Sequence, residues 1–255
     1  MRRDFVVDHF VLLTLGVFSA VVSLVFEVVP IVWTLLFFGL PIAYLSSKKP
    51  LIVRAAAIPA LLFGSTFGVA FEYINEINLS WLYPFHDDFF FPWKVFGFVP
   101  ADIVLWYILW IFLIVAYYEY FFDRPTKSIA TVHGVCALLL GGAALLAIHA
   151  WGERIVIPYT YAVLGLCSLI PVLIVLLRKR LPADRLLYAI PFFGILFLLM
   201  ELTALSLGYW EFTGQFVLLL SIAQHDVPVE ELFFWVIASP AVIIAHHELF
   251  TDDER

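Results

Sequence analysis

Two adjacent glutamates, Glu230 and Glu231, open the segment HDVPVEELFFWVIASPAVIIAHHELF, which is otherwise as apolar as a membrane-spanning helix. A charged side chain at the centre of such a helix costs about 2.5–3.5 kcal/mol on insertion scales. Glu72, Glu201 and Asp102 stand in similarly apolar surroundings. Carboxyl groups in a dry site can donate a proton, collect one or stabilise a cation. These five acids are therefore the predicted catalytic residues.

The position of each acid within its helix predicts whether it carries a charge. Asp102 and Glu230 each follow a proline by two residues, which puts them in a first turn, where the helix dipole favours a carboxylate. Capping of a helix start would by itself explain these two acids. Glu72 and Glu201 are expected late in their helices, where desolvation and the dipole favour a neutral, proton-donating acid. The alternative for this second pair is a buried acid hydrogen-bonded to a neighbouring helix.

Aromatic residues gather near the same helix ends. Those predicted to bind substrate are Trp81, Trp106, Tyr209, Trp210, Phe233, Phe234 and Trp235. Aromatic faces that line a cavity can stabilise a carbocation. The alternative for most of these residues is the belt of aromatic side chains that membrane proteins place at the lipid–water interface.

The composition indicates how these residues are held. Of the 255 residues, 64% are hydrophobic and 14% are charged, whereas soluble domains are about 25% charged. The sequence therefore predicts an all-α, polytopic membrane protein. About eight transmembrane helices are expected, near residues 8–28, 31–46, 51–72, 100–122, 128–149, 157–177, 186–207 and 228–249. Neither a dinucleotide or phosphate loop nor a Cys/His cluster is evident, so no cofactor and no metal are expected.

The basic residues predict the orientation. Twelve Lys and Arg residues fall on one side of the predicted spans and two, Lys94 and Arg154, on the other. The positive-inside rule then makes both termini cytoplasmic, in a multi-pass protein of the cell membrane. The long aromatic connections 73–99 and 208–227 fall on the outer face, where we expect them to fold back over the helices as a lid.

An internal repeat links the acids. FVPADIVLW at 98–106 matches DVPVEELFFW at 226–235, and in each half a glutamate precedes a tryptophan by nine residues, Glu72 and Trp81 in one and Glu201 and Trp210 in the other. We predict two four-helix repeats, 1–127 and 128–255, that run parallel about a pseudo-two-fold axis. Such an axis would turn Asp102 toward Glu230 or Glu231. Counting from the proline makes Glu230 its counterpart, and counting from the tryptophan makes it Glu231.

The motif YWEF…VPVEELFFW resembles the integral-membrane lycopene cyclases, over roughly residues 30–125 and 157–250. The fused form of that family carries two copies in one chain, which this sequence is similar to, although Asp102 and Ile103 replace the double acid in its first half. The resemblance implies a non-redox isomerase that cyclises the ψ end groups of lycopene to ionone rings inside the membrane. It also implies a lipophilic carotenoid or other isoprenoid substrate, contact with membrane lipid, no nucleic-acid partner and, as an option, association with other carotenoid-pathway enzymes.

Three other readings compete with cyclisation of lycopene. The same scaffold could cyclise another terpenoid or hydrate a carotenoid. Intramembrane acids in repeated halves are also typical of a proton-coupled transporter, which would need helices broken near the midplane. An intramembrane protease with a Glu-Glu-x-x-x-Arg helix is a poor match, because Trp235 occupies the arginine position.

Overall fold

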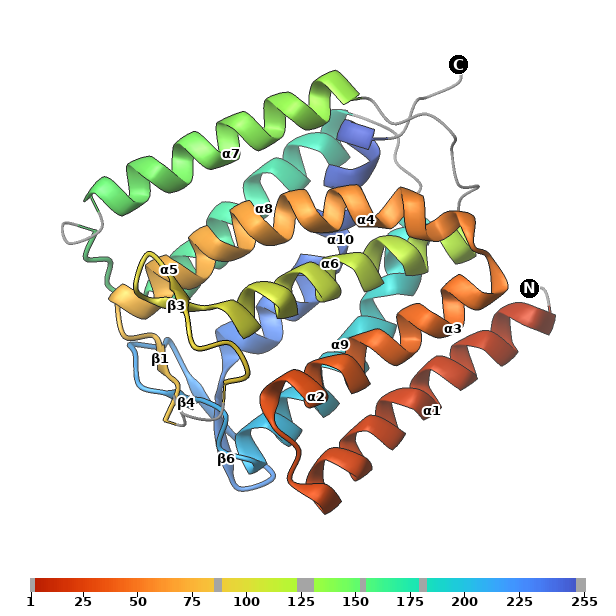
Figure 1. Ribbon diagram of the computed structural model, residues 1–255, viewed down its shortest axis with the longest axis horizontal. Helices are drawn as coiled ribbons and strands as arrows, with labels where there is room; N and C mark the ends of the chain where they lie inside the picture. Colours follow the sequence, from red (N-terminus) through yellow and green to blue (C-terminus); the bar gives the residue numbers. More distant parts are fainter. Residues whose placement is uncertain (1–2, 85–88, 123–130, 152–154, 179–182, 251–255) are drawn as a thin grey trace.

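The computed structural model describes residues 3–84, 89–122, 131–151, 155–178 and 183–250. Within these ranges the chain is almost entirely helical (Figure 1). The helices are α1 (Arg3–Phe26), α2 (Pro30–Thr34), η1 (Leu35–Gly39), α3 (Leu40–Lys48), α4 (Leu51–Phe63), η2 (Gly64–Gly68), α5 (Val69–Ile77), α6 (Ala101–Phe121), α7 (Thr131–Trp151), α8 (Thr160–Arg178), α9 (Ala183–Ser206) and α10 (Val229–Phe250). The segments η1 and η2 are π-helical turns inside otherwise continuous helices.

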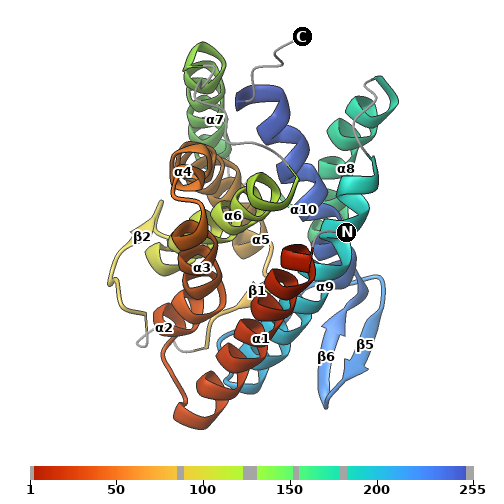
Figure 2. The same cartoon turned by 90° about the vertical axis from the view of Figure 1, so that its right-hand side faces the viewer.

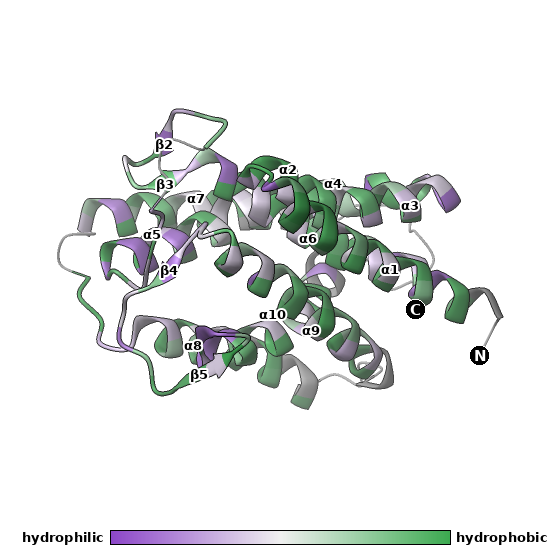
Figure 3. Cartoon of the chain, turned by 90° about the horizontal axis from the view of Figure 1, so that it is seen from below, coloured by the Kyte–Doolittle hydropathy of each residue, from purple (hydrophilic) through white to green (hydrophobic). Residues whose placement is uncertain are grey.

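Six helical segments in the described part of the chain are long and apolar enough to cross a membrane. They are Phe5–Phe26, Pro30–Lys48, Leu51–Ile77, Ala101–Phe121, Leu186–Ser206 and Val229–His246. Two shorter apolar helices, Leu138–Trp151 and Thr160–Ile174, accompany them. Apolar residues run along the helices, while polar residues gather at the helix ends and around the strands (Figure 3). The predicted class, an all-α polytopic membrane protein, is confirmed.

Short strands lie together at one end of the helices, away from the start of α1 and the end of α10 (Figure 1). They are β1 (Trp81–Leu82), β2 (Lys94–Val95), β3 (Val99–Pro100), β4 (Glu211–Phe212), β5 (Leu219–Ile222) and β6 (His225–Pro228). The pairs β2–β3 and β5–β6 are hairpins that lead into α6 and α10. The pair β1–β4 joins the two long connections to each other, with Trp81 opposite Phe212 and Leu82 opposite Glu211.

Of the six candidate spans in the described part of the chain, α6 is the most buried; it packs against α4 and η2 on one side and against α10 on another (Figure 2). Two glycines permit the first contact. A Cβ on Gly64 would lie 2.6–2.8 Å from the side chain and main chain of Ile108, and one on Gly68 would lie 2.6 Å from Tyr107. The small residues therefore let η2 approach α6 as closely as membrane helices do at small-residue contacts.

Buried polar contacts fasten the helices at the end opposite the strands. Asp8 of α1 accepts hydrogen bonds from Tyr44 of α3 at 2.5 Å and from Tyr120 of α6 at 2.6 Å. The side chains of Glu119 and His246 meet at 2.7 Å between α6 and α10. These contacts link α1, α3, α6 and α10 through groups that would be unfavourable in lipid without partners.

Two differences between the observed and the predicted helix limits affect the segments around the pocket. The third span continues to Ile77, five residues beyond the predicted end, and contains the π-helical turn η2. Pro100 and Pro228 end strands and cap α6 and α10 instead of occupying the first helical position. The second difference arises from the hairpins, which hold each proline in an extended conformation immediately before its helix.

Candidate functional site

A small pocket, with a cavity volume of about 50 Å³, lies between the helices at the end that carries the strands. Its lining comes from α5, α6, α8, α9, α10 and the β1–β4 pair. The lining residues are Phe71, Glu72, Trp81, Tyr83, Ile103, Trp106, Tyr107, Tyr161, Glu201, Trp210, Phe212, Glu231, Phe234 and Trp235. Three of these are glutamates and none is basic, so the pocket combines acidic groups with aromatic walls.

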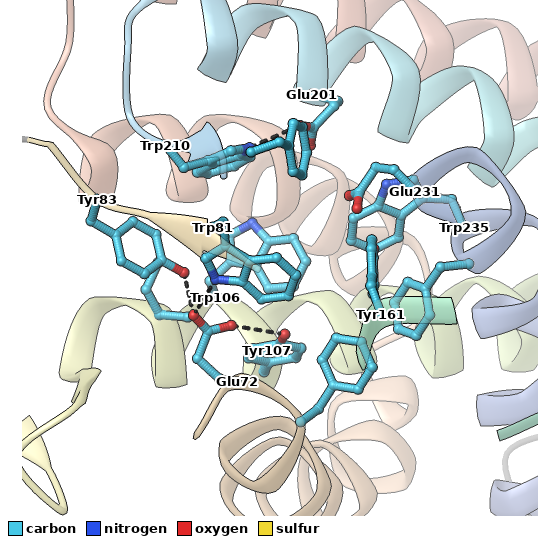
Figure 4. Close-up of a pocket in the computed structure, with 14 residues that line it drawn as sticks. Glu72, Trp81, Tyr83, Trp106, Tyr107, Tyr161, Glu201, Trp210, Glu231 and Trp235 are labelled. Carbon is cyan, nitrogen blue, oxygen red and sulfur yellow. Dashed lines mark hydrogen bonds between the residues drawn. The ribbon is translucent and has the colours of Figure 1, made fainter. Parts of the chain in front are cut away.

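Glu72 is buried and receives three hydrogen bonds (Figure 4). The indole N–H of Trp81 donates to its Oε1 at 2.8 Å, and the hydroxyl of Tyr83 donates to the same oxygen. The hydroxyl of Tyr107 donates to Oε2 at 3.2 Å. Burial and the neighbouring Glu72 hold the pKa of Tyr83 well above its usual value, so Tyr83 stays a neutral donor. Three donors converging on one carboxyl group stabilise its ionised form against the desolvation that burial imposes.

Glu201 has a sparser environment. The indole N–H of Trp210 donates to its Oε1 at 2.8 Å, as Trp81 does to Glu72. Its second oxygen, Oε2, is buried and has no hydrogen-bond partner. Glu231 of α10 lies close enough for the charges of the two carboxyl groups to interact, and Tyr161 lies beside Glu231 (Figure 4). Two carboxyl groups this close together in a buried site cannot easily both be ionised.

Eight of the predicted site residues meet in this one pocket. They are Glu72, Glu201, Glu231, Trp81, Trp106, Trp210, Phe234 and Trp235. They come from segments more than 150 residues apart, which the contacts between α6 and α10 and the β1–β4 pair bring together. The two long connections contribute Trp81, Tyr83, Trp210 and Phe212 to the lining of the pocket.

Asp102 and Glu230 lie outside the lining, contrary to the expectation that Asp102 would face an acid of the other half. Asp102 accepts hydrogen bonds from the backbone N–H groups of Phe90 at 2.8 Å and Phe91 at 3.0 Å. Glu230 accepts one from Val217 at 2.5 Å. Each acid therefore anchors its preceding connection to the start of its helix, since loop N–H groups need acceptors in an apolar setting.

The shared anchoring role answers the question of register that the sequence left open. Asp102 and Glu230 both lie two residues after the proline and both bind backbone N–H groups 11–13 residues upstream. Glu230 is thus the counterpart of Asp102. The counterpart of Glu231 is Ile103, so the third pocket acid occurs in one half alone.

Tyr209 and Phe233 also lie outside the lining. The Tyr209 ring packs against Trp33, and its hydroxyl donates to the backbone carbonyl of Val28, so it ties the connection after α9 to the α1–α2 connection. The side chain of Phe233 is 47% exposed on the outer surface of α10. Its neighbour Phe234 turns inward and stacks on Phe71 at a ring-centroid distance of 4.8 Å. One helical position, about 100° of rotation, separates the two environments.

The predicted set omitted Tyr83, Tyr107 and Tyr161. The repeat contained a signal for Tyr107, which follows Pro100 by seven residues just as Trp235 follows Pro228. Tyr83 lies two residues after Trp81, in the connection whose path the sequence did not specify. Tyr161 belongs to α8, and no motif marked it.

No cluster of three or more His, Cys, Asp or Glu side chains suited to a metal ion occurs in the part of the chain that the structure describes. Comparison with known proteins adds no relative, because no family model, curated protein or solved structure matches the chain. The fold and the pocket define a polytopic α-helical membrane protein with an acidic, aromatic-lined internal site.

Proposed function

We propose that this protein is a carotenoid cyclase, which closes the ψ end groups of lycopene or a related polyene into ionone rings by proton-initiated isomerisation. One observation carries the proposal: three buried glutamates share a single aromatic-walled pocket inside an apolar helical bundle. The exposed fractions of Glu72, Glu201 and Glu231 are 1%, 1% and 4%. The motif similarity to integral-membrane lycopene cyclases supports the same reaction class.

Each part of the reaction has a matching feature in the pocket. A carboxylic acid protonates a terminal alkene carbon, which leaves a tertiary cation. A neighbouring double bond attacks the cation, and the new carbon–carbon bond closes the ring. Loss of a proton to a carboxylate then restores the alkene, so no redox cofactor is consumed. Aromatic faces stabilise the cation, and exclusion of water prevents its capture as an alcohol.

The pocket and the apolar helices suggest how a long substrate would bind. We place one cyclising end of the polyene against the three glutamates and the aromatic walls of the pocket, and the remainder of the chain in the lipid between the helices. The substrate is lipid-soluble, so a multi-pass protein of the cell membrane, with both termini cytoplasmic as the basic residues predict, would receive it directly from the bilayer.

Expression in a bacterium that accumulates lycopene tests the proposal. We expect the wild-type chain to convert lycopene to products with one or two rings, separated by chromatography and identified by mass and absorption spectrum. A variant with Glu72, Glu201 and Glu231 all replaced by Gln, expressed at the same level, serves as the matched control. Unchanged lycopene beside well-expressed wild-type protein would refute carotenoid cyclisation. A product heavier by one water would instead identify a hydratase.

A further inference from the structure

The pocket is built largely from residues at matching positions of the two predicted repeats. Twelve of its fourteen lining residues form six such pairs, matched by their distance from the tryptophan or the proline of each half. The pairs are Glu72 with Glu201, Trp81 with Trp210, Tyr83 with Phe212, Ile103 with Glu231, Trp106 with Phe234, and Tyr107 with Trp235. The antiparallel β1–β4 pair places Leu82 opposite its own counterpart Glu211, as a two-fold relation requires.

Within this symmetric frame, two differences affect the same pair of acids. Glu72 receives hydroxyl hydrogen bonds from Tyr83 and Tyr107. At the matching positions around Glu201 stand Phe212, which has no donor, and Trp235, whose indole donates no hydrogen bond to Glu201 in the structure. Glu201 consequently keeps one buried oxygen without a partner, whereas both oxygens of Glu72 are hydrogen-bonded.

The third difference adds a carboxyl group near Glu201. Glu231 replaces the apolar Ile103 of the first half, and the two second-half acids are close enough to interact. Two carboxyl groups in a buried site hold one proton more readily than two charges. All three substitutions therefore act in one direction: they favour a carboxylate at Glu72 and a protonated acid at Glu201.

We propose that Glu201 is the proton donor and Glu72 the carboxylate that stabilises the cation and collects the proton, with Tyr83 and Tyr107 as positioning residues that fix this division. The inference rests on the proposed function for its substrate and deepens it by assigning roles. The Glu201 carbonyl oxygen Oε1 accepts from Trp210, which leaves Oε2 to carry the transferable proton into the pocket.

The proton balance closes over one turnover. The O–H bond of Glu201 breaks, and its proton goes to the alkene carbon. A neighbouring double bond attacks the cation and forms the ring carbon–carbon bond, which leaves a new cation in the ring. A C–H bond beside this second cation then breaks and gives its proton to Glu72. Release of that proton from Glu72 and uptake of one proton by Glu201 complete the cycle. The protein ends as it began.

Infrared spectroscopy of the purified protein without substrate tests the assignment. A protonated carboxyl group gives a C=O band that is distinct from carboxylate bands and that shifts in D₂O. We expect this band in the wild type, its loss in Glu201→Gln and its retention in Glu72→Gln. A band lost in Glu72→Gln but kept in Glu201→Gln would reverse the roles, and absence of the band from the wild type would refute the inference outright.

The positioning residues provide a second arm. Tyr83→Phe combined with Tyr107→Phe removes both hydroxyl donors from Glu72, so we expect a second protonated carboxyl band and a fall in ring formation of about 100-fold, the low end of a general acid–base contribution. Tyr73→Phe is the matched control, because Tyr73 is a buried tyrosine next to Glu72 in sequence that does not line the pocket. An unchanged spectrum in the double variant would refute the positioning role.

The spectroscopic and enzymatic results separate the two proposals. If the protonated-carboxyl band is lost in Glu201→Gln but lycopene is not cyclised, the division of roles between the acids stands and carotenoid cyclisation fails. If lycopene is cyclised but the band is lost in Glu72→Gln, the proposed function stands and the division of roles between the acids fails.

Phe212→Tyr offers Glu201 a new hydroxyl donor. It should weaken the band and lower ring formation about tenfold, roughly the effect of one added hydrogen bond to the ionised form of Glu201.

Discussion

Asn in place of Asp102 should destabilise the protein far more than Gln in place of Glu230, although both acids begin a helix after a proline. The Asp102 carboxylate accepts two backbone N–H bonds, from Phe90 at 2.8 Å and Phe91 at 3.0 Å. Asn offers one acceptor oxygen and turns its NH₂ toward the other N–H donor. One hydrogen bond is then lost and the other becomes neutral.

The size of the effect follows from these contacts. A hydrogen bond to a charged group contributes about 1.5–3 kcal/mol and a neutral one about 1 kcal/mol. Asp102→Asn should therefore lower the free energy of unfolding by about 2–4 kcal/mol. Glu230 has one such bond, at 2.5 Å from Val217, and its other oxygen has no partner. Glu230→Gln can keep the carbonyl oxygen on Val217, so its cost should be about 1 kcal/mol.

Thermal unfolding of both purified variants in the same detergent, followed by tryptophan fluorescence, measures the difference. For chains of about this size, 1 kcal/mol shifts Tm by about 2–4 °C. We expect Asp102→Asn to lower Tm by at least twice as much as Glu230→Gln. Equal shifts would show that the loop contacts of Asp102 contribute nothing. A normally stable Asp102→Asn protein that had lost all activity would assign Asp102 to the chemistry instead of to the loop.

Three further predictions concern the pocket and its supports. Trp210→Phe removes the indole donor from Glu201 and should lower ring formation about tenfold, measured as product per amount of protein. Activity within twofold of wild type would contradict a role of Trp210 in supporting Glu201. Phe234→Ala should cost about 3–5 kcal/mol of stability, whereas Phe233→Ala, on the exposed surface, should stay within about 0.5 kcal/mol, both measured by thermal unfolding in the same detergent. Gly64→Ala should cost about 1–3 kcal/mol of stability, because the new Cβ would overlap α6. A Cβ on Gly142 would have no atom within 4 Å, so Gly142→Ala should leave Tm unchanged or slightly raised.

Local sequence patterns were enough to predict the class of the protein and most of the pocket. Apolar runs bounded by charged residues predict membrane helices, because a helix is one of the few ways in which the backbone can satisfy its hydrogen bonds in lipid. The nine-residue spacing from glutamate to tryptophan occurs in both halves of the sequence, and in both the indole N–H donates to that glutamate in the structure. Such contacts depend on short stretches of chain, which the sequence describes directly.

The sequence could not predict which acids face the pocket. Asp102 and Glu231 are both acids in the first turn of a helix, yet one binds its own loop and the other lines the site. The difference depends on where Phe90 and Phe91 of the loop lie and on the packing of α10 against α6 and α9. Tyr161 likewise reaches the site because α8 packs on α10, a contact between helices that carry no shared motif.

The sequence by itself determined that the chain forms membrane helices and that acids and aromatic residues recur at fixed spacing in two halves, because hydrophobicity and local spacing are properties of short segments. The tertiary structure alone decided how the hydrogen-bond donors are divided among the acids. Three donors reach Glu72 and one reaches Glu201, since Tyr83 and Tyr107 converge from separate segments on the first acid while Phe212 and Trp235 stand at the matching places around the second. That division is a property of side chains brought together across the bundle.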